Sequence, residues 1–168
     1  MDIIAEKYKV IKEIGVGATG TVYLVEHVDL GIKYAVKVLN RFLSQDQSFI
    51  SRFKQEAEVL TRFTHPGSIQ LRDFGKTESG LYYMTMDFCE GEVLKEALKK
   101  KQRLSIKEAL EICNQTLEVL DAAHKAGIVH RDIKPENIML VNVDDNLTIK
   151  IMDFGIAKIR ESVDLGST

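Results

Sequence analysis

A glycine cluster followed directly by a strand is the feature that most constrains this chain. Gly15 to Gly20 read Gly-Val-Gly-Ala-Thr-Gly, and Thr21 to His27 has the pattern of a strand. A dinucleotide-binding fold needs a helix after the glycines and an acid about 20 residues on. Residues 35–40 contain no acid, and no lysine precedes Thr21 as a Walker loop requires. Two interpretations stay open: a structural hairpin turn, or a glycine hairpin that covers the phosphates of ATP.

The hydrophobic patterns predict a strand-rich first half and a helix-led second half. Strands are expected at 8–14, 21–27, 34–39, 69–74, 81–88, 138–141 and 147–152. Helices are expected from Ser48 to about Thr64, over 92–101, and from the capping box at Ser105 to Gly127. The fold class is therefore α+β, with an N-lobe over residues 1–88 and a hinge with a partial helical C-lobe over residues 89–168.

The composition argues against two kinds of binding partner, nucleic acids and membranes. The net charge of −2 and pI of about 6.1 give no basic field for nucleic acid. No apolar run approaches the ~20 residues of a membrane helix, and the acidic start does not resemble a signal peptide. The two cysteines cannot form a disulfide framework. We expect a cytoplasmic protein with no nucleic-acid partner and no membrane segment.

Two charged residues stand in apolar surroundings. Lys37 lies inside the run Ala35 to Leu39, and Glu56 shares a helix face with Phe53 and Leu60. Each could be a boundary residue by itself. Buried charges need partners, so the two together predict a Lys37–Glu56 ion pair. The lysine would then be able to hold phosphate oxygens.

A loop dense in chemistry lies between the long helix and the next strand. His130 to Asn137 reads His-Arg-Asp-Ile-Lys-Pro-Glu-Asn, which core packing does not explain. Phosphoryl transfer needs an acid, a cation and oxygen ligands for Mg²⁺. Asp132, Lys134 and Asn137 suit these roles in turn, and Asp153 after the last strand suits a second Mg²⁺ ligand.

The ordered motifs resemble those of the eukaryotic-type protein kinases, most of all their bacterial serine/threonine branch. They are the glycine loop, Ala35-Val36-Lys37, Glu56, His65-Pro66, the hinge from Met86, the loop at 130–137 and Asp153-Phe154-Gly155. The resemblance covers Tyr8 to Lys158. It implies a two-lobed kinase fold, ATP as cofactor with Mg²⁺ (Mn²⁺ as an alternative), and a protein substrate that offers serine or threonine.

The resemblance also implies roles for individual residues. The catalytic residues would be Asp132, Lys134, Lys37 and Glu56, and the metal ligands Asn137 and Asp153. The nucleotide would contact Ile14, Gly15, Val16, Gly17, Ala18, Thr19, Gly20, Val22, Ala35, Lys37, Met86, Asp87, Cys89 and Met139. A stack of side chains would join Leu60, Leu71, His130 and Phe154.

The expected function is ATP-dependent phosphorylation of protein serine and threonine hydroxyls. The chain stops within what would be the activation segment, so later C-lobe helices are not in it. The alternative is therefore a nucleotide-binding regulatory module or inactive fragment without efficient transfer. The long helix carries Leu110, Cys113, Leu117 and Leu120 as a stripe that needs cover. We expect this face to be exposed and to mediate self-association, or to be covered by a longer parent protein.

Overall fold

The computed structural model describes residues 3–143 and 146–154, except for the side chains at positions 56, 59 and 143. The chain forms two compact units. Unit 1 comprises residues 1–61 and 70–88, and unit 2 comprises residues 62–69 and 89–168. The predicted turn at Asp144-Asp145 and the glycine at position 155 lie outside the described residues. No helix within the described part is both long and apolar enough to cross a bilayer.

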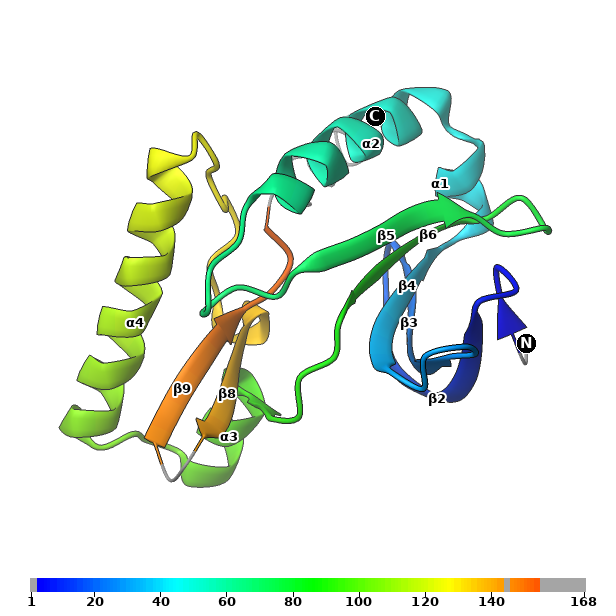
Figure 1. Cartoon of the computed structure of the whole chain (residues 1–168). Coiled ribbons are helices and arrows are strands. Elements are labelled where there is room, and N and C mark those ends of the chain that lie inside the picture. The colour runs from blue at the N-terminus through cyan, green and yellow to red at the C-terminus, as the bar shows by residue number, and fades with distance from the viewer. Residues whose placement is uncertain (1–2, 144–145, 155–168) are drawn as a thin grey trace. The chain divides into compact units, whose positions relative to one another are not determined.

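Unit 1 is built on an antiparallel sheet with the strand order β1-β2-β3-β4-β6-β5 (Figure 1). The strands are β1 (Ile3–Ile4), β2 (Tyr8–Gly17), β3 (Gly20–His27), β4 (Lys33–Leu39), β5 (Leu71–Lys76) and β6 (Tyr82–Asp87). All five strands predicted in this half of the chain are present, with ends shifted by a few residues. Predicted turns at Gly31 and Gly80 have φ angles of 66° and 83°, which suit glycine.

The two faces of this sheet carry different side chains. One face holds a buried cluster that includes Tyr8, Val36 and Tyr83. Side chains alternate along a strand, so Lys37 lies on the opposite face from Val36. Phe74 is paired with Met84, which is paired with Lys37, so Phe74 shares the face of Lys37.

Two helices accompany the sheet: α1 (Arg41–Gln45) and α2 (Gln47–Arg62). The short helix α1 was not predicted. The predicted cap of α2 at Ser48 is wrong: the Asp46 carboxylate accepts the backbone N–H of Ser48 at 2.9 Å and of Phe49 at 3.0 Å. Aspartate caps as well as serine, and here it stands at the earlier position. The rings of Phe53 and Phe74 lie 5.3 Å apart, so α2 packs on the sheet face that carries Lys37.

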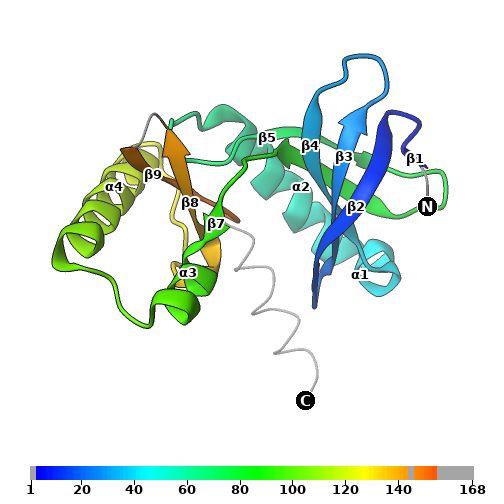
Figure 2. The ribbon, with the colours of Figure 1, turned by 90° about the horizontal axis from the view of Figure 1, so that it is seen from below.

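The described part of unit 2 combines helices with a small antiparallel sheet of order β7-β8-β9 (Figure 2). Its elements are β7 (Glu92–Val93), α3 (Leu94–Lys101), α4 (Ile106–Lys125), the 3₁₀ helix η1 (Pro135–Asn137), β8 (Ile138–Val143) and β9 (Asn146–Ile151). The capping box is present: the Ser105 side chain accepts the Glu108 N–H, and Glu108 accepts from the Ser105 N–H at 2.9 Å. The predicted helix at 92–101 begins with a two-residue strand instead.

The segment 62–69 belongs to unit 2, although the predicted N-lobe ran from 1 to 88 without a break. Its backbone bonds explain this difference. Ile69 N–H donates to the Ile151 carbonyl at 3.0 Å, and Ile151 N–H donates to the Gly67 carbonyl at 2.7 Å. The ring of Phe63 also lies 5.4 Å from that of Phe154. These pairings are distant in sequence, so local patterns do not reveal them.

Helix α4 has two apolar faces. Its buried face consists of Ile112, Thr116, Val119 and Ala123. Most of the predicted stripe is exposed: Leu110, Cys113 and Leu117 are open to solvent, with Leu117 63% exposed, while Leu120 is half-buried. The sequence pattern therefore found an apolar face that unit 2 leaves uncovered within the described residues.

Candidate active site

The loop from His130 to Asn137, the predicted catalytic loop, is fixed by backbone and side-chain bonds to Met152, which follows β9. His130 is 1% exposed, and its Nε2 lies 2.8 Å from the Met152 carbonyl oxygen. The Met152 N–H donates to the Asn137 carbonyl at 2.9 Å. The ring of Phe154 meets the His130 ring edge-on at 4.7 Å. Both ends of the loop, at His130 and at Asn137, are thus bonded to Met152, the residue before Asp153.

These bonds define the protonation of His130. A carbonyl oxygen can only accept, so Nε2 carries the proton. The other ring nitrogen, Nδ1, accepts the Asp132 N–H at 3.3 Å and must be unprotonated. Burial disfavours the charged ring and lowers the pKa of His130 below its usual value, although the Met152 carbonyl and the charges of Asp153 and Asp132 oppose this shift. His130 is therefore neutral at pH 7, and its role is to bond the loop to Met152.

We expect unit 2 to lose stability as the pH falls below 6.5. The unfolded histidine takes up a proton near pH 6.5, whereas folded His130 does so only at lower pH. The stabilisation is therefore complete above pH 6.5 and declines as the pH drops towards the folded pKa. An NMR titration, with the His130 signal assigned from a His130→Gln variant, should give a midpoint below 6.5. A midpoint above that value would show that burial does not keep His130 neutral.

The side chains of Lys134 and Asn137 both contact the Asp132 carboxylate. The Lys134 ammonium lies 2.7 Å from Asp132 Oδ2. The Asn137 amide nitrogen donates to the Asp132 backbone oxygen at 2.8 Å and to Oδ2 at 3.2 Å. Asn137 is only 7% exposed, and η1 begins with Pro135, which favours the first turn of a helix. The structure thus brings together the acid, the cation and the amide predicted from the loop.

Asn137 and Asp153, the predicted magnesium ligands, both offer side-chain oxygen atoms. Within residues 3–143 and 146–154, the hydrogen bonds of the Asn137 side chain use its amide nitrogen, and its amide oxygen could serve as a ligand. Asp153 follows β9 with φ 56°, a left-handed conformation that aspartate tolerates better than most residues. Arg131, in the predicted catalytic loop, also has a left-handed backbone, with φ 66°. This conformation costs about 1–2 kcal/mol for a residue other than glycine. Hard oxygen donors of this kind suit Mg²⁺.

The glycine cluster forms the hairpin between β2 and β3. Gly15 is paired with Val22, Val16 with Thr21, and Gly17 with Gly20. A Cβ at Gly20 would lie 2.0 Å from the Val38 carbonyl oxygen, so only glycine fits there. Ala18 and Thr19 form the turn, and the Val16 side chain is exposed. A helix does not follow the glycines, as the strand pattern predicted.

Four of the predicted nucleotide residues of unit 1, namely Val22, Ala35, Lys37 and Met86, lie on one sheet face. Val22 is paired with Lys37, and Ala35 is paired with Met86. Cross-strand partners point to the same side, and Ala35 and Lys37 are two residues apart. The Lys37 residue is 4% exposed, and none of the side chains that the structure describes forms an ion pair with it. The helix that carries position 56 packs on this same face, but the Glu56 side chain is not described, so the ion pair stays a prediction.

The remaining predicted residues are divided between the units. Ile14 lies in β2 and Asp87 at the end of β6, where the Arg72 guanidinium holds its carboxylate at 2.6 and 2.8 Å. Cys89 and Met139 belong to unit 2, together with Asp132, Lys134, Asn137 and Asp153.

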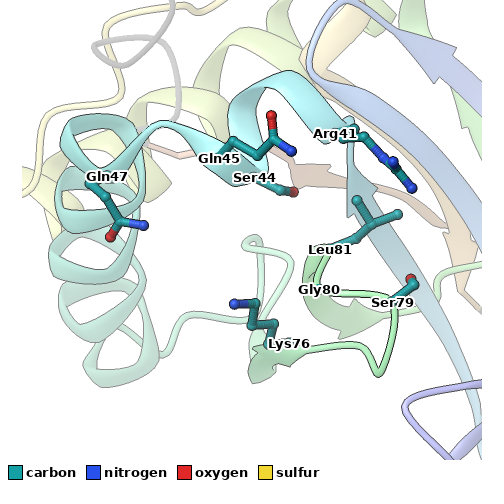
Figure 3. A pocket seen from close by; sticks show the side chains of 8 residues that line it. All are labelled: Arg41, Ser44, Gln45, Gln47, Lys76, Ser79, Gly80 and Leu81. Carbon is teal, nitrogen blue, oxygen red and sulfur yellow. The ribbon is translucent and has the colours of Figure 1, made fainter.

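Two hollows in the described residues contain none of the predicted site residues. One, of about 360 Å³, lies in unit 1 between the α1–α2 region and the β5–β6 turn (Figure 3). The other, of about 530 Å³, lies in unit 2 between α4, β9 and residues 65–67. Figure 3 shows that Arg41 and Lys76 point in different directions, so the first hollow does not focus positive charge on one point.

The sequence interpretation missed the partner of Glu136. This residue lies inside the catalytic loop, and Lys95 of α3 forms an ion pair with it at 2.9 Å. Side-chain hydrogen bonding by Lys95 lowers the pKa of Glu136. The four-residue spacing of Lys95 and Lys99 on a charged helix could have indicated a basic face, but nothing local points to Glu136.

Comparison with known proteins agrees with this geometry. A model of the protein kinase domain matches residues 8–165. The serine/threonine-protein kinase pkn3 of Myxococcus xanthus is 39% identical over 166 residues, 97% of this chain and 30% of that protein. The serine/threonine-protein kinase PrkC of Bacillus subtilis is 38% identical over 165 residues, 98% of this chain and 25% of that protein. The chain thus spans less than a third of the length of these two relatives.

A solved structure extends the likeness to three dimensions. The PknI kinase domain of Mycobacterium tuberculosis has a TM-score of 0.79 and 32% identity, covering 92% of this chain and 62% of that one. The predicted kinase-like α+β fold, with an N-lobe and a partial C-lobe, is thereby confirmed. The domain match covers almost the whole sequence and includes the glycine hairpin, Lys37 and the Asp132 loop. On this evidence, the chain belongs to the protein kinase family.

Proposed function

We propose that this chain binds MgATP and takes part in transferring its γ-phosphate to serine or threonine hydroxyls of proteins. The observation that carries the proposal is the convergence of Lys134 and Asn137 on the Asp132 carboxylate. Such an arrangement serves phosphoryl transfer, in which catalysis is mostly positioning and charge stabilisation. The relatives named above, which are called serine/threonine-protein kinases, support the same reaction and the same acceptor.

Asp132 would act on the acceptor hydroxyl. Its carboxylate orients the O–H group and takes the proton as the new oxygen–phosphorus bond forms. The bond between the γ-phosphorus and the bridging oxygen breaks, and ADP leaves with that electron pair. Lys134, already 2.7 Å from Asp132, would stabilise negative charge on the phosphoryl oxygens.

Asn137 and Asp153 would hold Mg²⁺, with Mn²⁺ as an alternative ion. The metal neutralises charge on the phosphates when it is bound. The Asn137 amide nitrogen donates to Asp132, and its amide oxygen would be the atom that meets the metal. The Asp153 carboxylate supplies the negative charge that a hard cation favours.

The nucleotide contacts follow from the face of the unit 1 sheet that carries Lys37. By the kinase resemblance, Val22, Ala35 and Met139 would sandwich the base, and Met86 would take the gatekeeper position. Backbone groups of Asp87 and Cys89 would bind the adenine edge. The Gly15–Gly20 hairpin would cover the phosphates, and Lys37, paired with Glu56, would hold their oxygens.

We further propose that the exposed face of α4 mediates self-association of this 168-residue chain in the cytoplasm. Leu110 and Leu117 lie two turns apart on one side of α4 and are 58% and 63% exposed. Burying both side chains against a second copy would stabilise the pair by a few kcal/mol at most, at roughly 1.5–3 kcal/mol per leucine. Sedimentation of the wild type should show association that a Leu110→Glu/Leu117→Glu variant abolishes. A wild type that stays monomeric at the highest soluble concentration would contradict this.

Transfer of labelled γ-phosphate to a generic protein acceptor, followed by phosphoamino acid analysis, tests the function. We expect label on serine or threonine only. A chain that binds MgATP but transfers no label would instead match the alternative of a nucleotide-binding module. Label on tyrosine would contradict the proposed acceptor.

A further inference from the structure

The tip of the glycine hairpin is tied to a residue that no motif includes. Asn40 follows β4 and precedes α1. Its side-chain nitrogen donates to the Ala18 carbonyl at 2.9 Å, and its backbone N–H donates to the Thr19 carbonyl at 3.1 Å. Ala18 and Thr19 form the turn of the hairpin. One residue therefore binds both carbonyl groups of that turn.

The same side chain also caps a helix. Asn40 Oδ1 accepts the Leu43 N–H at 2.9 Å and so forms the N-cap of α1. The nitrogen of the Asn40 carboxamide thus bonds the hairpin, and its oxygen bonds α1. Because both bonds share a single planar group, the hairpin turn is held in register with the start of α1.

The large apolar side chain at the end of the hairpin does not pack into unit 1. Val16, the large apolar side chain of the hairpin end, is 73% exposed. Thr19 is buried, but its hydroxyl has no hydrogen-bond partner among the described residues. At the base of the hairpin, the Gly20 backbone lies so close to the Val38 carbonyl that no side chain fits. The bonds from Asn40 are therefore the polar contacts that fix the carbonyl groups of Ala18 and Thr19.

We propose that Asn40 is a positioning residue that orders the glycine hairpin for the phosphates of ATP. This inference rests on the proposed MgATP binding. Backbone N–H groups bind phosphate well only when they already point at it, and ordering a loop during binding costs conformational entropy. By holding the carbonyl side of the turn, Asn40 sets the direction of the peptide groups whose N–H groups would meet the phosphates.

Two variants separate the hairpin bond from the cap. Asn40→Ser keeps a favourable N-cap for α1, but its shorter side chain cannot reach the Ala18 carbonyl. It adds no charge, unlike Asn40→Asp, which would repel phosphates for another reason. Asn40→Ala removes both bonds. The backbone bond from residue 40 to Thr19 persists in every variant.

Hydrogen exchange of the full 168-residue chain gives the first readout. In Asn40→Ser we expect the amides of residues 16–19 to exchange about three- to tenfold faster than in the wild type, while those of α1 are unchanged. In Asn40→Ala, both segments should exchange faster.

Binding gives the second readout. In Asn40→Ser the MgATP dissociation constant should rise about three- to tenfold, the range that one lost neutral hydrogen bond gives. Adenosine, which lacks phosphates, should bind with unchanged affinity. Equal losses for both ligands would show a merely structural role and overturn the proposal.

The two readouts keep the inference distinct from the function on which it rests. A wild type that fails to bind MgATP would overturn the proposed function, while hydrogen exchange would still test the anchoring of the hairpin. Unchanged exchange at residues 16–19, or a MgATP affinity within twofold of the wild type in Asn40→Ser, would overturn the role of Asn40.

Discussion

An Asp132→Asn variant is expected to lose γ-phosphate transfer by on the order of 10²–10⁴-fold, the usual contribution of a general base. The amide cannot take the proton of the acceptor hydroxyl, and the Lys134 ammonium loses the carboxylate that it contacts at 2.7 Å. MgATP binding should stay within about twofold of the wild type, because Asp132 is not among the expected ligands. Initial rates of label transfer at saturating MgATP measure the effect.

Asp121→Asn is a matched control for this variant. Asp121 also pairs with a lysine at 2.7 Å, but on the exposed surface of α4, where such pairs contribute little to stability. The control should transfer phosphate at the wild-type rate. Equal rates for the wild type and Asp132→Asn would show that Asp132 does not act as the general base.

An Asp153→Asn variant is expected to bind MgATP at least about tenfold more weakly and to lose the advantage that Mg²⁺ gives over metal-free ATP. The substitution removes the one carboxylate of the proposed ligand pair, and Mg²⁺ is held through one or two carboxylates in such sites. Calorimetric titration of ATP with and without Mg²⁺ measures both quantities.

Asp29→Asn, in the exposed β3–β4 turn, changes the net charge equally and should bind MgATP as the wild type does. This control separates ligation from a general change in charge. An Asp153→Asn variant that retained the full Mg²⁺ dependence would place the metal elsewhere.

Features that depend on local bonds were predictable from the sequence. The capping box of α4 needs only residues 105–108, and both of its bonds are present. The hairpin of β2 and β3 follows from glycines between two alternating segments. The loop from His130 to Asn137 was found because its density of polar side chains has no packing explanation, and its side chains do converge.

Features that depend on distant partners were not predictable. The five residues of α1 are too few to show a helical period. Residues 62–69 join unit 2 through the backbone of Ile151, which no side-chain pattern encodes. Helix α4 has two apolar faces, and the sequence does not say which one its own unit buries. The bond from Asn40 to Ala18 likewise joins residues 22 positions apart.

Calorimetric titration of MgATP into the wild-type chain tests the central claim most directly. We predict saturable binding with a dissociation constant below about 1 mM, the upper end of ordinary substrate affinities, that weakens when Mg²⁺ is chelated. A sample shown to be folded by its NMR spectrum that binds no ATP at that concentration, with or without Mg²⁺, would contradict the account.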